Sequence, residues 1–139
     1  MAVATGAVEQ GRTFPLPRGE DDALEGYQSP ITLCADESCL DTSELEQAAK
    51  RYQMVNIKLD KTGGLTEALN LARRAKEKGM TLMIGNMTGT SLAMAPAYVV
   101  AQLCDFVDLD GALFLVGDRS YPMSYERGVV TGLSSQLWG

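Results

Sequence analysis

The chain has 139 residues, of which 45% are apolar, and a formal net charge of −6. This length and apolar content predict one packed globular domain and exclude a disordered chain. The acidic balance, with lysines and arginines dispersed among acids, excludes the basic patch that binding to nucleic acid or an anionic membrane requires.

Residues 1–14 form the first predicted segment. Met1–Thr13 is rich in small residues and weakly periodic, so we expect it to be poorly ordered or at most one irregular strand. Met1–Gly11 has neither the basic start nor the apolar core of a signal peptide. Two prolines, a glycine and three consecutive acids over residues 15–22 predict a loop, and a short helix follows at Ala23–Tyr27.

From residue 31 onward, four short apolar runs have the composition of strands. They are Ile31–Ala35, Met54–Leu59, Thr81–Ile84 and Asp105–Leu109.

Helical patterns separate these strands. A capping box, formed by Asp41 with Glu44 or by Ser43 with Glu46, precedes a helix with Leu45, Ala48, Ala49 and Tyr52 on one face. The next helix runs over Leu65–Lys78 and ends at Gly79. The third begins near Ser91 and is nearly all apolar to Leu103, with Pro96 close to its first turns. Its apolar run is too short to span a bilayer.

Landmarks at the strand ends recur at a regular spacing. Asp36 to Lys58 is 22 residues, Lys58 to Gly85 is 27, and Gly85 to Asp108 is 23. A β/α unit of roughly 25 residues is typical of a parallel barrel or a doubly wound sheet. A full eight-unit barrel takes about 250 residues, so this chain holds about four units, or half a barrel. The predicted fold class is α/β, over one domain at residues 15–139.

The strand ends also carry the polar residues. In order these are Asp36, Lys58, the Gly85–Met87 turn, and Asp108 with Asp110. Because the carboxyl ends of parallel strands open into the site of such folds, we expect these groups to converge. Alternation along a strand predicts that Asn56, Lys58 and Asp60 share one face, and that Asp108 and Asp110 share another.

Composition limits the chemistry that these groups can perform. The chain has no histidine, so a proton must be moved by lysine, carboxylate, tyrosine or cysteine, and a metal would be a hard cation such as Mg²⁺. The three cysteines, Cys34, Cys39 and Cys104, are odd in number and lack metal-type spacing. A reducing, cytoplasmic location fits this pattern best, and Cys34 is expected to be buried rather than reactive.

Each polar residue has a structural interpretation that stays open. Asp36 alone could begin a helix or end a loop, and Lys58 alone could be a solvated charge. Asp108 and Asp110 could end a strand and cap a turn. The glycines at 63 and 64 permit a tight turn and match neither dinucleotide-binding nor P-loop spacing.

Taken together, the motifs are more specific. Their combination resembles the C-terminal half of dipeptide epimerases of the enolase superfamily, which are mandelate racemase/muconate lactonizing enzyme-like. The motifs are Ala35–Ser38, Asn56–Gly64, Gly85–Met87 with Thr90–Ala93, and Asp108–Asp110. The resemblance covers about residues 15–139 and implies the C-terminal half of a (β/α)8 barrel, with the N-terminal capping domain absent.

The resemblance also implies a reaction. It is racemase- or epimerase-type proton transfer, assisted by Mg²⁺, at the carbon α to a carboxylate of a dipeptide. Lys58 would be the acid/base residue, and Asp108 and Asp110 would bind the α-ammonium group of the substrate. Asn86 and Met87 would line the pocket near the substrate backbone.

The metal ligands implied by the resemblance are fewer than in the family. Asp36 would be one ligand. The family places a Glu-Gln pair directly before the proline at position 15, whereas Thr13 and Phe14 stand there. Glu9 would be a second ligand if the residues between Gln10 and Pro15 are an insertion.

Other family elements are missing from the sequence. In the family the opposing lysine comes from a Lys-x-Lys element on an earlier barrel strand, and this element and the first metal carboxylate have no counterpart here. We therefore expect low or no activity from this chain alone, as a fragment of an isomerase. The alternative is a non-catalytic half-barrel that self-associates, as a homodimer completing the barrel, or that pairs with an N-terminal half. An unrelated flavodoxin-like domain would lack a phosphate-binding loop here.

Overall fold

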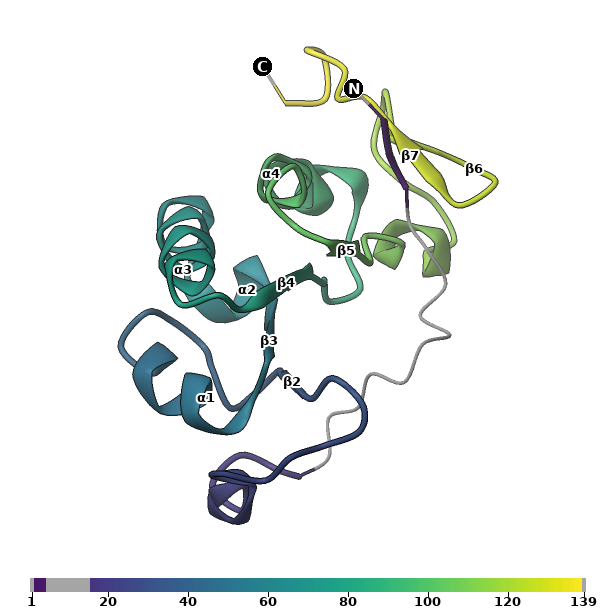
Figure 1. The fold of residues 1–139 in the computed structure, drawn as a ribbon. Coiled ribbons are helices and arrows are strands. Elements are labelled where there is room, and N and C mark those ends of the chain that lie inside the picture. The colour runs from purple at the N-terminus through teal and green to yellow at the C-terminus, as the bar shows by residue number, and fades with distance from the viewer. Residues whose placement is uncertain (1, 5–15, 139) are drawn as a thin grey trace.

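Four parallel strands form the central sheet of this computed structural model, which describes residues 2–4 and 16–138. The strands are β2 (Cys34–Ala35), β3 (Met54–Ile57), β4 (Thr81–Ile84) and β5 (Phe106–Val107), and they pair in that order (Figure 1). Each unit adds its strand beside the preceding one, as in successive units of a (β/α) barrel, whereas a doubly wound sheet reverses direction. The partial barrel predicted from the sequence is confirmed.

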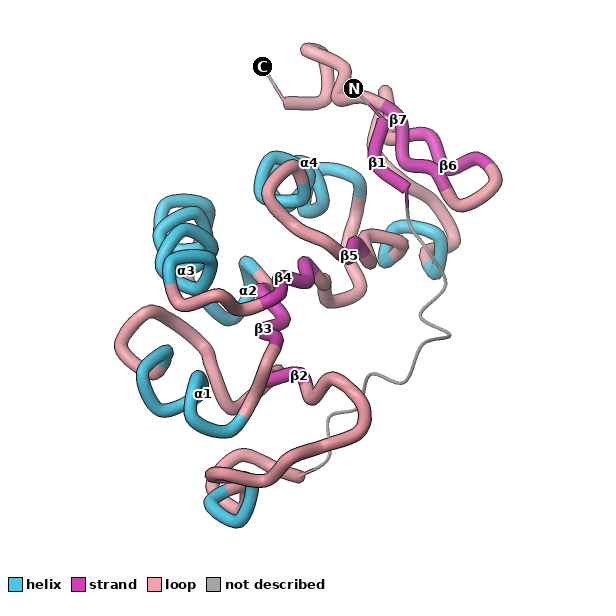
Figure 2. Tube along the Cα trace, in the orientation of Figure 1, coloured by secondary structure: helices cyan, strands magenta, loops and turns pink. Residues whose placement is uncertain are grey.

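Helices cover one face of this sheet. They are α1 (Leu45–Arg51), α3 (Leu65–Glu77) and α4 (Ser91–Ala101). Figure 2 shows these helices gathered on one side of the magenta strands. None of the helices in residues 2–4 and 16–138 has the length and apolarity needed to cross a bilayer.

Alternation along the strands divides the core in two. Ala35, Ile57, Leu82 and Val107 face the helices and belong to the main buried cluster. The intervening side chains form a separate buried cluster on the other face, made of Cys34, Met54 and Met83 with Phe106 packed against it. Side chains alternate between the two faces along a strand. Just beyond the strand ends, the next positions on this second face are Asp36, Lys58, Gly85 and Asp108, at the carboxyl edge of the sheet.

Several boundaries differ from the sequence expectation. β2 and β5 are only two residues long, and the short helix expected at Ala23–Tyr27 is a 3-10 turn, η1 (Asp22–Leu24). Pro96 lies in the interior of α4 rather than near its start. Because proline has no N–H, α4 loses one internal hydrogen bond there.

The predicted capping box is also wrong. Glu44 occupies the N-cap of α1 without a side-chain cap. Instead, Glu44 Oε2 accepts a hydrogen bond from the Leu40 N–H at 2.8 Å, and Asp41 Oδ1 accepts one from the Ser43 N–H at 2.8 Å. The acids therefore stabilise the loop before the helix, not its first turn.

A short helix that the sequence did not predict follows β3. Helix α2 (Leu59–Thr62) begins directly after Lys58 and ends at Gly63, whose φ of 79° lies in the left-handed region. Gly64 follows with φ of 126°, so two glycines make the turn into α3. Since Asp60 is in α2 and exposed, the expectation that it continues the strand face of Asn56 and Lys58 is wrong.

A second, antiparallel sheet was not predicted either. β6 (Ser124–Glu126) pairs with β7 (Val129–Thr131) through a turn at Arg127 and Gly128, both with positive φ. β1 (Ala2–Ala4) pairs with the other side of β7, consistent with the single N-terminal strand allowed by the sequence (Figure 1). Glu9 lies outside the described residues.

Candidate active site

The carboxyl edge of the parallel sheet brings together two of the predicted site residues. Lys58 directly follows β3 and Asp36 directly follows β2, and Lys58 Nζ lies 2.9 Å from Asp36 Oδ2. Their side chains are 14% and 10% exposed, respectively. A charged pair that is this poorly hydrated interacts more strongly than one at the surface. The solvated-charge interpretation of Lys58 is therefore wrong.

A third residue of this cluster escaped the sequence analysis. Lys61 Nζ pairs with Asp36 Oδ1, and its side chain is 9% exposed. Lys58 directly precedes α2 and Lys61 lies within its single turn, and this turn brings the second amine to the same carboxylate. The sequence places the two lysines three residues apart, but their shared partner could be expected only if a helical turn had been predicted directly after Lys58.

The acidic pair lies near the lysine. Burial raises the pKa of Asp108, and the charge and hydrogen bonding of Asp110 raise it further, whereas the charge of Lys58 lowers it. Asp108 is fixed by its N–H, which donates to the Ile84 carbonyl at 2.9 Å. Asp110 begins the 3-10 turn η2 (Gly111–Phe114). Two carboxylates thus face one another at the edge that holds Lys58.

Replacing Asp108 with asparagine is expected to stabilise the protein at neutral pH. Because the folded-state pKa of Asp108 is raised above its ordinary 3.8, its contribution to stability falls as pH rises through the interval between those values. Asparagine has no such titration, so we expect a gain of up to about 1 kcal/mol at pH 7, which vanishes below the ordinary pKa. Urea unfolding at pH 3 and pH 7 measures both.

The matched control for this substitution is Asp60→Asn. Asp60 is exposed on α2, away from Asp108 and Asp110 in sequence, so its replacement removes the same charge at a solvated position and should leave the stability nearly unchanged. If Asp108→Asn is no more stable than the original chain at pH 7, the proximity of the two carboxylates is not a source of strain.

Asn86 and Met87 connect the loop after β4 to η2. Asn86 Oδ1 accepts a hydrogen bond from the Gly111 N–H at 3.0 Å, and Met87 is 49% exposed. A Cβ at Gly111 would lie 2.7 Å from the Met87 carbonyl oxygen, so the loops approach too closely for a larger residue. Asn86 therefore positions the turn that carries Asp110.

Asn56 lies beside Lys58 in the same region. The residue is 2% exposed, and its Oδ1 has no hydrogen-bond partner among the described residues. A Cβ at Gly85 would lie 2.8 Å from that oxygen and 3.1 Å from Lys58 Cε. Gly85 thus leaves the space that Asn56 and Lys58 occupy, and an unpaired buried acceptor faces it.

The described residues do not by themselves fit a magnesium ion. Mg²⁺ requires near-octahedral oxygen coordination, and both oxygens of Asp36 are engaged by ammonium groups. Residues 2–4 and 16–138 contain no group of three histidine, cysteine or acidic side chains placed to hold a metal. Asp36 is the only predicted ligand within the described residues, so further ligands would have to come from elsewhere.

Comparison with known proteins places these features in context. The family described as enolase C-terminal domain-like matches residues 15–121. An N-acetyl-D-glutamate racemase from Pseudoalteromonas sp. is 52% identical over 125 residues, which are 90% of this chain and 40% of the relative. An L-Ala-D/L-Glu epimerase from Escherichia coli is 47% identical over 114 residues, which are 82% of this chain and 36% of the relative.

Solved structures show the same partial match. An enolase family member from Agrobacterium tumefaciens with homology to dipeptide epimerases, with bound sodium and L-Ala-L-Glu, has a TM-score of 0.86 and 50% identity over 90% of this chain and 38% of that one. A dipeptide epimerase from Methylococcus capsulatus complexed with Mg and L-Arg-D-Lys has a TM-score of 0.77 and 32% identity, over 84% of this chain and 35% of that one. The chain thus spans about two fifths of the length of the curated relatives it matches.

Proposed function

The chain belongs to the enolase C-terminal domain-like family, and from that membership we propose that it carries the acid/base half of a racemase or epimerase site. The reaction is proton transfer at the carbon α to a carboxylate of a dipeptide. The observation that supports it most directly is the poorly hydrated Lys58 amine 2.9 Å from Asp36 at the carboxyl edge of the sheet. Reactive groups in parallel β/α folds stand at that edge.

Lys58 is the group suited to move the proton. A neutral amine accepts the α-proton, and the ammonium group that forms returns the proton to the carbon. Removal of the proton leaves an anion on the substrate carboxylate, and positive charge nearby stabilises it. Lys61 holds a second positive charge at the same edge, beside Asp36.

Asp108 and Asp110 suit the other end of the substrate. Burial is the larger cause of the raised pKa of Asp108, and the nearby charge of Asp110 raises it further. A ligand's ammonium group placed between them would relieve that repulsion. A dipeptide with a free amino terminus offers such a group, and relatives have been solved with L-Ala-L-Glu and L-Arg-D-Lys.

Magnesium dependence is proposed only for a completed site. Asp36 would be one ligand there and Glu9 another, and a solved relative is complexed with Mg. The described residues do not form that metal site. The proton transfer and the binding of the ammonium group proposed above therefore use only the side chains of this chain. Asn86 and Met87 are proposed to line the pocket from the loop after β4.

The second candidate is a non-catalytic half-barrel that self-associates. β2 and β5 are the two edge strands of the parallel sheet, each paired on one side only within the described residues. Unpaired strand edges favour pairing with another chain. A homodimer could complete a barrel in this way, as could an N-terminal half supplied by another polypeptide.

An exchange experiment separates the two candidates. The chain is incubated with L-Ala-L-Glu in deuterated buffer, with and without Mg²⁺, and the glutamate α-proton signal is followed by NMR. We expect slow deuterium incorporation with retention of configuration, because one lysine serves one face of the carbon. Inversion would indicate two opposing lysines in an assembled dimer. Exchange no faster than in a protein-free blank would contradict the catalytic proposal.

A further inference from the structure

We propose that Arg18 is a positioning residue for the active-site edge, acting through the loop that follows β2. Its guanidinium group holds both ends of that loop, and the loop begins at Asp36. The chemical importance of the Asp36–Lys58 pair rests on the proposed function, but the positioning itself can be tested without catalysis.

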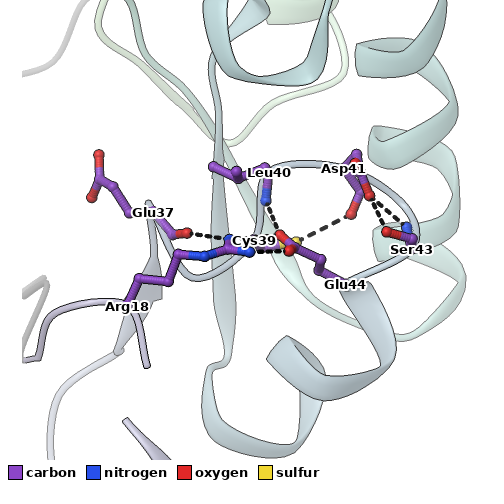
Figure 3. A network of polar contacts seen from close by, with 7 residues as sticks. All are labelled: Arg18, Glu37, Cys39, Leu40, Asp41, Ser43 and Glu44. Atoms are coloured by element: carbon purple, nitrogen blue, oxygen red, sulfur yellow. Dashed lines mark hydrogen bonds and ion pairs between the residues drawn. The ribbon is translucent and has the colours of Figure 1, made fainter. Parts of the chain in front are cut away.

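The contacts of Arg18 are bidentate and span the whole loop. Arg18 Nη1 donates to the Glu37 carbonyl at 2.9 Å and to Glu44 Oε2 at 2.9 Å, while Nη2 pairs with Glu44 Oε1 (Figure 3). Glu44 Oε2 also accepts the Leu40 N–H at 2.8 Å. One guanidinium group thus joins the residue next to Asp36, the middle of the loop and the N-cap of α1.

A second polar clamp from the same segment supports the loop. Tyr52 donates its hydroxyl hydrogen to Asp21 Oδ2 at 2.8 Å, and Ser38 Oγ lies 3.3 Å from the Tyr52 hydroxyl oxygen. A cavity of about 350 Å³ lies among these groups, and its lining includes Arg18 and Asp21, the loop residues Ser38 and Glu44, and Gln47 and Arg51 of α1. The segment is therefore held against the loop by polar contacts where apolar packing is interrupted.

Position at this edge is sensitive to the loop. Asp36 precedes Glu37, so a displaced Glu37 carbonyl shifts the backbone of Asp36 directly. Asp36 in turn receives Lys58 at 2.9 Å and Lys61 on its other oxygen, and hydrogen bonds weaken steeply outside their optimal geometry. Neither lysine has a hydrogen bond or ion pair with Arg18 among those seen in the described residues.

If Arg18 contributed only to stability, as a surface ion pair, the expected result would differ. The Arg18 and Glu44 side chains are 48% and 28% exposed, and such pairs contribute only about 0–1 kcal/mol to stability. If that were all, removing the pair would lower stability slightly and leave the lysine ammonium groups as they are. The positioning role instead predicts a local change at Lys58 and Lys61, which lie 40 and 43 residues from Arg18 in sequence.

The test compares Arg18→Gln and Arg18→Lys with the original chain, each labelled with ¹³C and ¹⁵N. The readout is the ¹H–¹⁵N correlation signals of the Lys58 and Lys61 ammonium groups, together with the ¹³Cγ shift of Asp36. We expect both variants to shift or broaden all three signals by more than a linewidth. Lysine should not rescue them, because a single ammonium group cannot reproduce the fork that bridges Glu37 and Glu44.

Two further variants keep the result interpretable. Glu44→Gln removes the charge of the carboxylate that Arg18 binds, and it should change the same three signals. This variant provides the test if Arg18→Gln fails to fold. Glu46→Gln breaks the exposed ion pair between Glu46 in α1 and Lys78 at the end of α3, and it should change none of the three signals. Unchanged signals in Arg18→Gln would overturn the positioning role. Dipeptide exchange is scored separately, so shifted signals with no exchange would reject the proposed reaction alone.

Discussion

Replacing Lys58 with methionine should abolish deuterium exchange at the glutamate α-carbon of L-Ala-L-Glu. Methionine keeps an unbranched stem but has no amine to accept the proton. General-base catalysis by a positioned side chain contributes about 10²–10⁴-fold, so the loss should bring the rate to that of the blank. The measurement is the α-proton NMR signal over time, at equal protein concentration and equal Mg²⁺.

Two other lysines provide the controls for this result. Lys61→Met removes a positive charge beside Asp36 and should reduce exchange less than Lys58→Met, since Lys61 is not assigned the proton transfer. Lys50→Met, at an exposed position on α1, should leave the rate unchanged. If Lys58→Met retains the exchange rate of the original chain, the acid/base role belongs to another residue.

The strand-end residues could be predicted because their signal is local. A short apolar run followed by a polar residue and a glycine-rich turn describes one β/α unit, and four such units recur at similar spacing. Parallel strands align their carboxyl ends without further information. This is why the Lys58–Asp36 contact followed from the sequence although 22 residues separate the two.

The elements that escaped prediction depend on tertiary context. Helix α2 is only four residues long, too short to show helical periodicity, and Lys61 was missed with it. The β6–β7 hairpin turns through Arg127–Gly128, a weaker signal than Asn-Gly or Asp-Gly. Its partner β1 lies at the other end of the chain, so their pairing has no local signature.

Asp21 illustrates the same limit at a single residue. In the sequence it lies within three consecutive acids, which predict a solvated loop. In the fold it is 2% exposed and lies against Arg51 and Tyr52, about 30 residues away. Runs of charged residues are normally exposed. Asp21 is buried because Arg51 of α1 and the next residue, Tyr52, pack against it, and this packing cannot be read from the local sequence.

Replacing Asp21 with asparagine should destabilise the fold by about 3 kcal/mol, within the range for breaking a buried ion pair. Arg51 Nη1 lies 2.7 Å from Asp21 Oδ1, with side chains 12% and 3% exposed. The Asp21 carboxylate accepts hydrogen bonds from both Arg51 and Tyr52. In asparagine one of the two carboxylate oxygens becomes an NH₂ group, which is itself a donor, so one of these two hydrogen bonds is lost. Urea unfolding at pH 7 measures the loss, a large share of a small domain's stability.

The pH dependence identifies the charge as the cause. Burial would raise the pKa of Asp21, but hydrogen bonds from Ser38, Tyr52 and its own backbone, with the charge of Arg51, hold it below its ordinary 3.8. A lowered folded-state pKa contributes stability above the ordinary value, which is lost as pH falls through the folded one. The difference between the original chain and Asp21→Asn should therefore be constant from pH 7 to pH 5 and shrink below the ordinary pKa.

The neighbouring acid is the control that makes this prediction decisive. Asp22 also pairs with Arg51, but its side chain is 83% exposed, so Asp22→Asn should cost less than about 1 kcal/mol. The two substitutions remove the same charge from adjacent positions and differ mainly in burial. Equal losses would mean that net charge near Arg51 sets stability. A large loss at Asp21 alone would mean that stability depends on the buried contacts that join residues 18–22 to α1. Water can replace the lost partner at the exposed Asp22 but not at the buried Asp21.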